Sequence, residues 1–366
     1  MKRDIPALLT LLLICASMLG CGGFWDSSSS GSGTSNAVLY VINNNGGGTG
    51  GVVPFHIKSS GKLSTISDEV GAGTDPNSAV ITSDNKYLYV GNADGGISAY
   101  AIASDGSLSA LSGSPYATGV TPVSLAIESG GIYLYALDTT SSAISVYRIS
   151  SSTGSLSAVQ TVYFSSVATL SGPLYAVRAA PHKKYLYVAL GADGIWVYKI
   201  GASGTLTYVT SVKAPTGGQS MDIAIEPNGN FAYAPDGVSG ILAYSVDQSG
   251  GLAVLSGSPF AAGTYPVAAA VDPSAKHLYV VNQGANSLSA FTRNSDGTLS
   301  ALTGQPGTGL TPTSVTVESS GKFVYVTNEN ESPDISIVQI QSDGRLASVG
   351  SSSSGTAPIA SVVTHY

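Results

Sequence analysis

Two charged side chains break the pattern of an internal repeat, and they are the strongest candidates for chemistry in this chain. Arg178 stands in a column of the repeat that otherwise holds Val, Ala or Thr, and Asp222 stands in a column that otherwise holds Ser or Ala. A guanidinium can bind an anionic or carbonyl oxygen of a ligand, and Tyr175 is close to Arg178 in the sequence. The same two charges could instead form a buried ion pair that joins two units. The sequence leaves both interpretations open.

Other motifs of catalytic or metal sites are absent from the sequence. The four histidines are scattered, without the spacing of metal ligands, at His56, His182, His277 and His365. The glycine-rich segment 46–51 joins two expected strands and lacks the Lys-Ser/Thr pair of a phosphate-binding loop. There is no Gly-x-Ser-x-Gly nucleophile turn. We therefore expect no metal and no cofactor, and the sequence assigns no catalytic residue.

The elements that carry Arg178 and Asp222 belong to a sevenfold repeat. One tyrosine recurs at intervals of 49, 46, 52, 46, 46 and 46 residues, at Tyr40, Tyr89, Tyr135, Tyr187, Tyr233, Tyr279 and Tyr325. A leucine two residues after a glycine also occurs once per unit, at Leu63, Leu108, Leu156, Leu206, Leu252, Leu299 and Leu346. A period near 46 residues in short alternating strands is typical of propeller blades. We predict an all-β, seven-bladed β-propeller with four-stranded antiparallel blades.

Each unit shows the same order of strands. An apolar strand, usually after a proline, is followed by the tyrosine strand, by a third strand and by a fourth that begins at the Gly-x-Leu turn. Six third strands carry an aromatic residue, at Phe55, Tyr100, Tyr147, Tyr198, Tyr244 and Phe291. Because every unit carries the tyrosine and the leucine, we interpret them as packing residues rather than a ligand-stacking ladder. The fourth unit departs most, with Arg178, Leu190, Trp196 and the run 182–184.

The two ends of the repeat complete each other. Pro266, Pro312 and Pro358 are 46 residues apart, so a first strand is expected at 359–364, with no tyrosine strand behind it. The segment 37–41 is a tyrosine strand with no first strand before it. Pairing of the C-terminal strand with the N-terminal blade would close the ring and remove the open sheet edge.

The repeat motif points to a family. Tyr325-Val326-Thr327-Asn328, its variants at 40–43 and 279–282, and the Gly-x-Leu turns resemble the seven-bladed lactonase propellers of the YVTN type. That family includes 6-phosphogluconolactonases and carboxymuconate cycloisomerases, and the resemblance covers residues 37–366. It implies the propeller fold and, as an activity, lactone hydrolysis or cycloisomerisation.

The residues that the resemblance implies for catalysis do not occur at the matching positions. The family pattern places a His near the start of one inner strand, Pro-Arg-His on the next, and Asn-Glu after that unit's tyrosine strand. Here Tyr175 replaces the first His, and Met221 and Asp222 replace Arg-His. Gly237 replaces the Glu. The resemblance therefore offers no catalytic residue for this chain.

The N-terminus resembles a bacterial lipoprotein signal. Lys2 and Arg3 precede an apolar run, and Met18-Leu19-Gly20-Cys21 resembles a lipobox. An ordinary cleaved secretory peptide and a retained membrane anchor are the alternatives. We predict a signal peptide over 1–20, lipid attachment at Cys21, a Ser/Gly-rich tether over 21–36 and the propeller over 37–366. The protein would then be exported and held at the outer membrane or on the periplasmic or extracellular face of the envelope.

Composition limits the partners. Charged residues make up 10% of the chain, against roughly 25% in typical soluble domains, and the net charge is −7. No basic stripe occurs, so we expect no nucleic acid partner. We expect a monomer that contacts the membrane through its lipid only. Two functions remain: a scaffold that binds a small molecule or an envelope protein, and a lactone hydrolase or cycloisomerase with a remodelled site.

Overall fold

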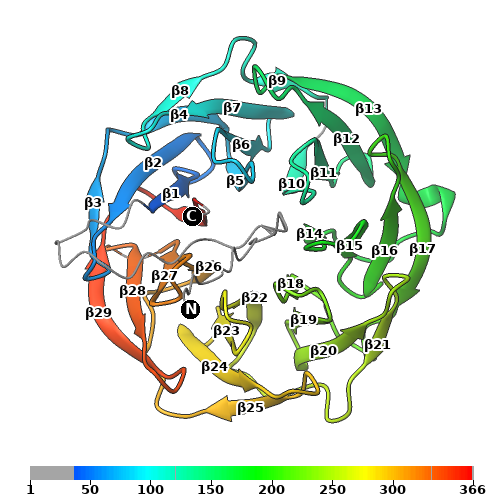
Figure 1. Cartoon of the computed structure of the whole chain (residues 1–366), viewed down its shortest axis with the longest axis vertical. Helices are drawn as coiled ribbons and strands as arrows, with labels where there is room; N and C mark the ends of the chain where they lie inside the picture. Colours follow the sequence, from blue (N-terminus) through cyan, green and yellow to red (C-terminus); the bar gives the residue numbers. More distant parts are fainter. Residues whose placement is uncertain (1–36, 120, 331, 365–366) are drawn as a thin grey trace, which may run out of the picture.

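Seven antiparallel β-sheets are arranged radially around one axis (Figure 1), in a computed structural model that describes residues 37–119, 121–330 and 332–364. We number the blades along the chain and give the strands from the axis outward. Blade 1 contains β30 (Pro358–Val363), β1 (Val38–Asn43), β2 (Thr49–Ile57) and β3 (Leu63–Thr65). Blade 2 contains β5 (Pro76–Ile81), β6 (Tyr87–Asn92), β7 (Gly96–Ile102) and β8 (Leu108–Ala110). Blade 3 contains β10 (Pro122–Ile127), β11 (Tyr133–Asp138), β12 (Ala143–Ile149) and β13 (Leu156–Tyr163). Blade 4 contains β14 (Ala176–Ala179), β15 (Tyr185–Ala189), β16 (Ile195–Ile200) and β17 (Leu206–Val212). Blade 5 contains β18 (Ala224–Ile225), β19 (Phe231–Asp236), β20 (Gly240–Val246) and β21 (Leu252–Val254). Blade 6 contains β22 (Pro266–Val271), β23 (His277–Asn282), β24 (Ser287–Arg293) and β25 (Leu299–Leu302). Blade 7 contains β26 (Pro312–Val317), β27 (Phe323–Asn328), β28 (Ile335–Ile340) and β29 (Leu346–Ser352). The predicted fold is confirmed.

Three short elements add to this plan. β4 (Val70–Thr74) pairs with β2, and β9 (Tyr116–Ala117) pairs with β7, so two blades carry a fifth strand that the repeat does not predict. One helical turn, η1 (Phe164–Ser166), follows β13. No helix in the described part of the chain could span a membrane.

Closure occurs as the repeat predicts. β30 pairs antiparallel with β1, with Leu39 opposite Val363 and Tyr40 opposite Val362. The Val38 N–H donates to the Thr364 hydroxyl at 2.9 Å, which extends the pairing past the end of the strand. The last strand of the described chain thus becomes the innermost strand of the first blade, and no inner edge of that blade is left unpaired.

The repeated tyrosines hold neighbouring blades together. Each of the seven is fully buried, and its O–H donates to the carbonyl of the glycine in the Gly-x-Leu turn of the next blade. The bond from Tyr325 to Gly61, at 2.8 Å, carries this pattern across the closure. These glycines have positive φ, and a Cβ on Gly297 would lie 2.2 Å from the Phe231 ring of the preceding blade. The packing interpretation of the tyrosines is confirmed.

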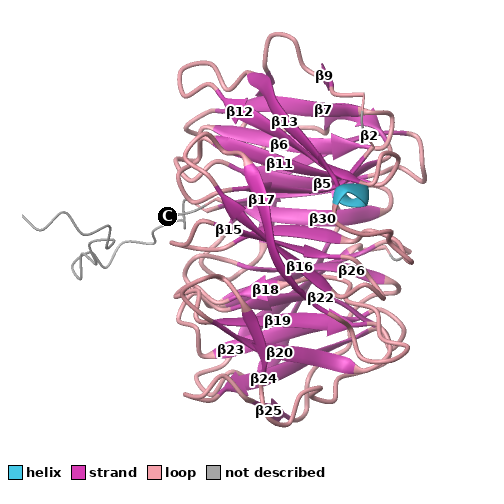
Figure 2. Cartoon of the chain, turned by 90° about the vertical axis from the view of Figure 1, so that its right-hand side faces the viewer, coloured by secondary structure: helices cyan, strands magenta, loops and turns pink. Residues whose placement is uncertain are grey.

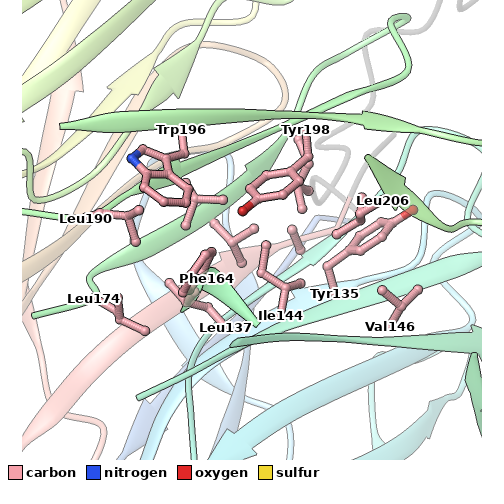
Figure 3. Packing of buried hydrophobic residues seen from close by; sticks show 14 of the residues in the cluster. Tyr135, Leu137, Ile144, Val146, Phe164, Leu174, Leu190, Trp196, Tyr198 and Leu206 are labelled. Atoms are coloured by element: carbon pink, nitrogen blue, oxygen red, sulfur yellow. The ribbon is translucent and has the colours of Figure 1, made fainter. Parts of the chain in front are cut away.

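Two departures of the fourth unit also serve packing. The longer connection to blade 4 places Phe164 between blades 3 and 4, edge-on to Trp196 with ring centroids 5.7 Å apart. Leu190, where other units carry Asn or Asp, packs in the same buried cluster (Figure 3). Trp196 and Leu190 therefore fill the space that the longer connection encloses.

One inner strand is shorter than the sequence predicts. The family pattern places Met221 and Asp222 on the inner strand of the fifth unit, but here the structure has only an isolated bridge at Ser220, and β18 begins at Ala224. Pro235 of β19 lies opposite this segment; its carbonyl accepts the Met221 N–H at 2.9 Å, but it has no N–H to return. The segment around Asp222 therefore lacks the regular backbone hydrogen bonding of an inner strand.

The propeller has two distinct faces. We call the face where β1 begins and β30 ends the terminal face; it carries the turns from each inner strand to the tyrosine strand and from each third strand to the fourth. We call the opposite face the loop face; it carries the remaining connections. In the side view of Figure 2 the terminal face is on the left and the loop face, with η1, is on the right.

Candidate functional site

A cavity of about 500 Å³ lies on the propeller axis, lined by the segments that begin the inner strands of all seven blades. Small and hydroxylated side chains form most of its wall, including Ser78, Ser124, Thr313, Ser314 and Ser361. Among the described residues, Arg178 and Asp222 are the only charged ones that line it. Tyr175 and Met221 line it as well, so the structure brings all three candidate residues to one cavity.

Arg178 and Asp222 are in contact. The Nη2 atom of Arg178, on β14, lies 2.6 Å from Oδ1 of Asp222. The Arg178 side chain is 40% exposed, whereas the Asp222 side chain is 9% exposed. The ion pair predicted as one interpretation therefore exists, but its arginine half remains open to the cavity.

The pair is part of a network that crosses four blades. Arg178 Nη1 donates to the Ser124 hydroxyl of blade 3 and to the Val177 carbonyl, both at 3.0 Å. The Val177 N–H also donates to the Ser124 hydroxyl, at 3.1 Å. Asp222 Oδ2 accepts the Ala269 N–H of blade 6 at 3.4 Å. The guanidinium is therefore fixed in position before any ligand arrives.

The network leaves donors unused. A guanidinium carries five N–H groups; the hydrogen bonds to Ser124 and Val177 occupy two of them, and Nη2 faces Asp222 in the ion pair. The Nε–H and one Nη2–H of Arg178 have no partner among the described residues. Since the side chain is partly exposed in the cavity, these groups can donate to a ligand oxygen.

Tyr175 supplies a further donor. It lies one residue before β14 and its ring packs against Gly191, where a Cβ would be 3.0 Å from Cε2. Burial, with a smaller contribution from nearby Tyr265, raises the pKa of the Tyr175 phenol. The phenol is therefore protonated at neutral pH and can donate a hydrogen bond.

Apolar side chains lie beside Met221 and elsewhere on the loop face. Gly237 lies beside Met221 and the ring of Tyr265, and exposed Val238 and Leu310 stand on neighbouring connections of the same face. The sequence does not single out Tyr265, Val238 or Leu310, because apolar residues in loops give no signal until the topology gathers them. Ser124 and Ala269 were missed as well, since each matches its repeat column.

The positions matched to the family's catalytic pattern lie in or beside this cavity, but they do not carry the side chains of that pattern. Tyr175, Met221 and Asp222 line the cavity, and Gly237 adjoins its rim, but no described histidine lines it. His277 instead pairs with Asp272 at 3.0 Å on the terminal face. No group of His, Cys, Asp and Glu in the described ranges could hold a metal ion. Cys21, the segments 1–20 and 21–36, and His365 lie outside the described residues.

Electrostatics disfavour a strongly anionic ligand. The charges of Arg178 and Asp222 cancel at 2.6 Å, so the cavity wall is neutral overall. The loop face around it carries one described lysine, Lys213, against nine acidic residues: Asp68, Glu69, Asp75, Asp94, Asp138, Asp193, Asp236, Glu329 and Asp334. An anion would have to approach through this negative field.

Solved structures with this architecture include enzymes acting on sugar lactones. A candidate 6-phosphogluconolactonase from Bacteroides uniformis matches with a TM-score of 0.77 at 20% identity, over 89% of this chain and 98% of that one. A second candidate 6-phosphogluconolactonase, from Bacteroides fragilis, matches with a TM-score of 0.76 at 20% identity, over 92% and 99%. The periplasmic gluconolactonase PpgL of Pseudomonas aeruginosa matches with a TM-score of 0.75 at 20% identity, over 90% and 99%.

These likenesses, at 20% identity, establish the fold alone. No curated protein matches the chain by sequence. The family model described as "Lactonase, 7-bladed beta-propeller" matches residues 47–363, which span six whole blades and most of the first. The chain therefore belongs to the seven-bladed β-propeller lactonase family.

Proposed function

We propose that this protein is a lipid-anchored propeller of the cell envelope that binds a small, uncharged, polar ligand in its axial cavity. The single observation that carries the proposal is the state of Arg178: it is fixed by Ser124, Val177 and Asp222, yet it retains free N–H groups in the cavity. A buried ion pair with only a structural role does not require an exposed arginine. Donors fixed in advance bind an oxygen at little conformational cost.

The cancelled charge supports a neutral ligand rather than an anion. Asp222 already supplies the counter-ion of Arg178 at 2.6 Å, and a second anion would have to displace it or share it. A carbonyl or hydroxyl oxygen needs only the free N–H groups and the Tyr175 phenol. The hydroxyl groups of Ser314, Ser361 and Thr313 on other blades suit further polar groups of the same ligand.

Export and anchoring rest on the N-terminal motif ending in Cys21. The periplasmic location named for the Pseudomonas structure is consistent with export. Because β1 begins on the terminal face, a tether before it would leave the rim at Tyr265 and Met221 free.

Hydrolysis of an unphosphorylated lactone is the second candidate function, and family membership favours it. Arg178 and Tyr175 could polarise a lactone carbonyl by donating to its oxygen. The attacking water needs a base, however, and both oxygens of Asp222 are engaged, by Arg178 and by the Ala269 N–H. Binding without turnover therefore fits the present groups better. Cycloisomerisation would meet the same lack of a free base.

Calorimetric titration with glucono-1,5-lactone, its carboxylate product gluconate and the 6-phosphorylated lactone tests the proposal. We expect the neutral lactone to bind at least tenfold more tightly than either anion. Arg178→Ala should abolish this binding, while Tyr175→Phe should weaken it about tenfold, the usual effect of one lost hydrogen bond. Tighter binding of the anions would refute the neutral-ligand proposal. Proton release from the lactone above the background rate would favour the enzyme.

A further inference from the structure

The second large cavity of the molecule lies on the terminal face, away from the axial site. We propose that the terminal face docks on an anionic phospholipid surface and that the groove around Arg148 receives a lipid phosphate group. The proposal builds on the membrane anchoring in the proposed function and adds a surface, an orientation and a lipid class.

The basic residues are gathered on one face by the topology. Eleven of the thirteen described lysines and arginines belong to turns or strand ends of the terminal face: Lys58, Lys62, Lys86, Arg148, Lys183, Lys184, Lys199, Lys276, Arg293, Lys322 and Arg345. The same face carries nine acidic residues, whereas the loop face carries nine acidic residues and Lys213 alone. The molecule is therefore strongly polarised along its axis, with the negative end at the axial site.

Three of the nine acidic residues of the terminal face are turned inward, as are Asp138, Asp236 and Asp334 of the loop face. Glu226, Asp272 and Glu318 are buried, and their carboxylates accept backbone N–H groups of their own turns. The basic residues are mostly free. Of these eleven residues, only Lys86, Arg293 and Arg345 form ion pairs with described carboxylates. Exposed lysines such as Lys184, Lys199 and Lys276 are therefore available to an external anion.

The groove has the chemistry of a phosphate site. It measures about 570 Å³, lies between blades 2 and 3 and contains the exposed Arg148 guanidinium. Tyr87 and six serine or threonine residues also line it: Thr82, Ser83, Ser150, Ser151, Ser155 and Ser157. The one carboxylate in the groove, Asp84, is engaged by Lys86 at 3.0 Å and by Thr82 at 2.7 Å. Arginine with hydroxyl donors is the set that phosphate oxygens accept from.

The chain ends give the orientation. β1 begins and β30 ends on the terminal face, so a membrane anchor before residue 37 would approach from that side (Figure 2). An anionic bilayer would attract the free lysines and repel the acidic loop face. The axial cavity would then open away from the membrane, toward the surrounding fluid.

Sedimentation with vesicles tests the docking surface without the anchor. Residues 21–366 carrying Cys21→Ser are mixed with phosphatidylcholine vesicles or with vesicles containing phosphatidylglycerol. We expect at least about fivefold more binding to the anionic vesicles at low salt, the contribution of one interfacial cation, and its loss as salt rises. Equal binding to both vesicles would overturn the proposal.

Charge reversals locate the surface. Arg148→Glu should reduce the binding at least about fivefold, and Lys184→Glu with Lys276→Glu should remove it. Lys213→Glu makes the same charge change on the loop face and should leave the binding unchanged. Equal losses for Arg148→Glu and Lys213→Glu would show only a net-charge effect and would overturn the proposal. Labelled fatty acid on wild-type Cys21 tests the anchor separately, so either result can fail without the other.

Discussion

At the scale of single residues, Arg178 and Asp222 form an ion pair that joins blades and that leaves Arg178 partly exposed in the axial cavity. Asp222 is almost fully buried, and its partners lie on blades 4 and 6. Arg178 links blade 4 to blades 3 and 5 through Ser124 and Asp222. A charge that joins blades in this way stabilises the inner wall only while its partner is present. The two interpretations that the sequence left open are therefore compatible.

A double-mutant cycle separates the stabilising role from the binding role. Asp222→Asn and Arg178→Met should each lower the free energy of unfolding by about 1–3 kcal/mol, less than a fully buried pair would because Arg178 is partly exposed. The double variant should recover part of this loss, with a coupling energy above about 0.5 kcal/mol in denaturant titrations. Binding of the neutral ligand should fail in both variants that lack Arg178. Additive losses would contradict the contact between the two side chains.

The repeat determines which residues of the site can be predicted from the sequence. Arg178 and Asp222 stand out because each is the one charge in its column. Ser124 looks like any small residue of its column, and Ala269 takes part through its backbone N–H. Such partners are invisible before the blades are placed side by side, because the contacts join residues that are about 50 positions apart in the chain.

At the scale of the elements, the tyrosine strands behave as one interlocked set. Each tyrosine hydroxyl reaches a glycine carbonyl in the next blade, so every interface between blades carries one buried phenol. Burial raises the pKa of six of these phenols well above the usual value: Tyr89, Tyr135, Tyr187, Tyr233, Tyr279 and Tyr325. It also raises the pKa of Tyr100, in a third strand, to about 12.

Alkaline unfolding should therefore be unusually steep. A phenol whose pKa is raised in the folded state favours folding fully below its unfolded pKa of about 10 and loses that contribution as the pH rises toward the folded value. Each such tyrosine adds about 1.4 kcal/mol per pH unit to the loss. We expect the sheet signal in circular dichroism and the tyrosinate absorbance to change together between about pH 10 and pH 12. Tyr325→Phe should reduce by one the number of protons that the protein releases on alkaline unfolding, and the pH dependence should become less steep. Gradual tyrosinate formation in a molecule that stays folded would contradict the prediction.

The strand plan was predictable because each unit repeats it; the exceptions were not. Counting gives seven blades and places Leu63 and Leu346 at the starts of outer strands, as observed. It does not give β4 or β9, whose segments lie in the variable connections, nor the short β18. The missing donor of Pro235 explains β18 only once the register shows that it faces Asp222's segment.

At the scale of the whole molecule, the propeller fold places charged residues that are scattered along the sequence on two faces of different net charge. Most basic residues are far apart in the chain, yet the alternating direction of the strands places Lys58, Lys184 and Lys322 on the same side. The sequence could suggest an anchor at one end but not which face would meet the membrane. The first and last strands of the propeller begin and end on the face that carries the lysines, and the rim of the axial cavity lies on the opposite face.

Closure makes the two ends of the chain unequal, and this gives the last prediction. Deleting residues 355–366 removes β30, which pairs with β1 from Leu39 to Asn43, and the Thr364 hydroxyl that accepts the Val38 N–H. The inner edge of blade 1 would then be open, and the buried faces of Tyr40 and Val41 would lose the strand beside them. We expect a fall in the melting temperature of more than about 10 °C or failure to fold, since losing a buried strand far exceeds a typical point mutation. Deleting residues 21–35, before the first strand, should shift the melting temperature by less than about 1 °C, because no paired strand is lost. Equal melting of the two truncated proteins would show that the ring does not depend on β30, and closure through blade 1 would have to be abandoned.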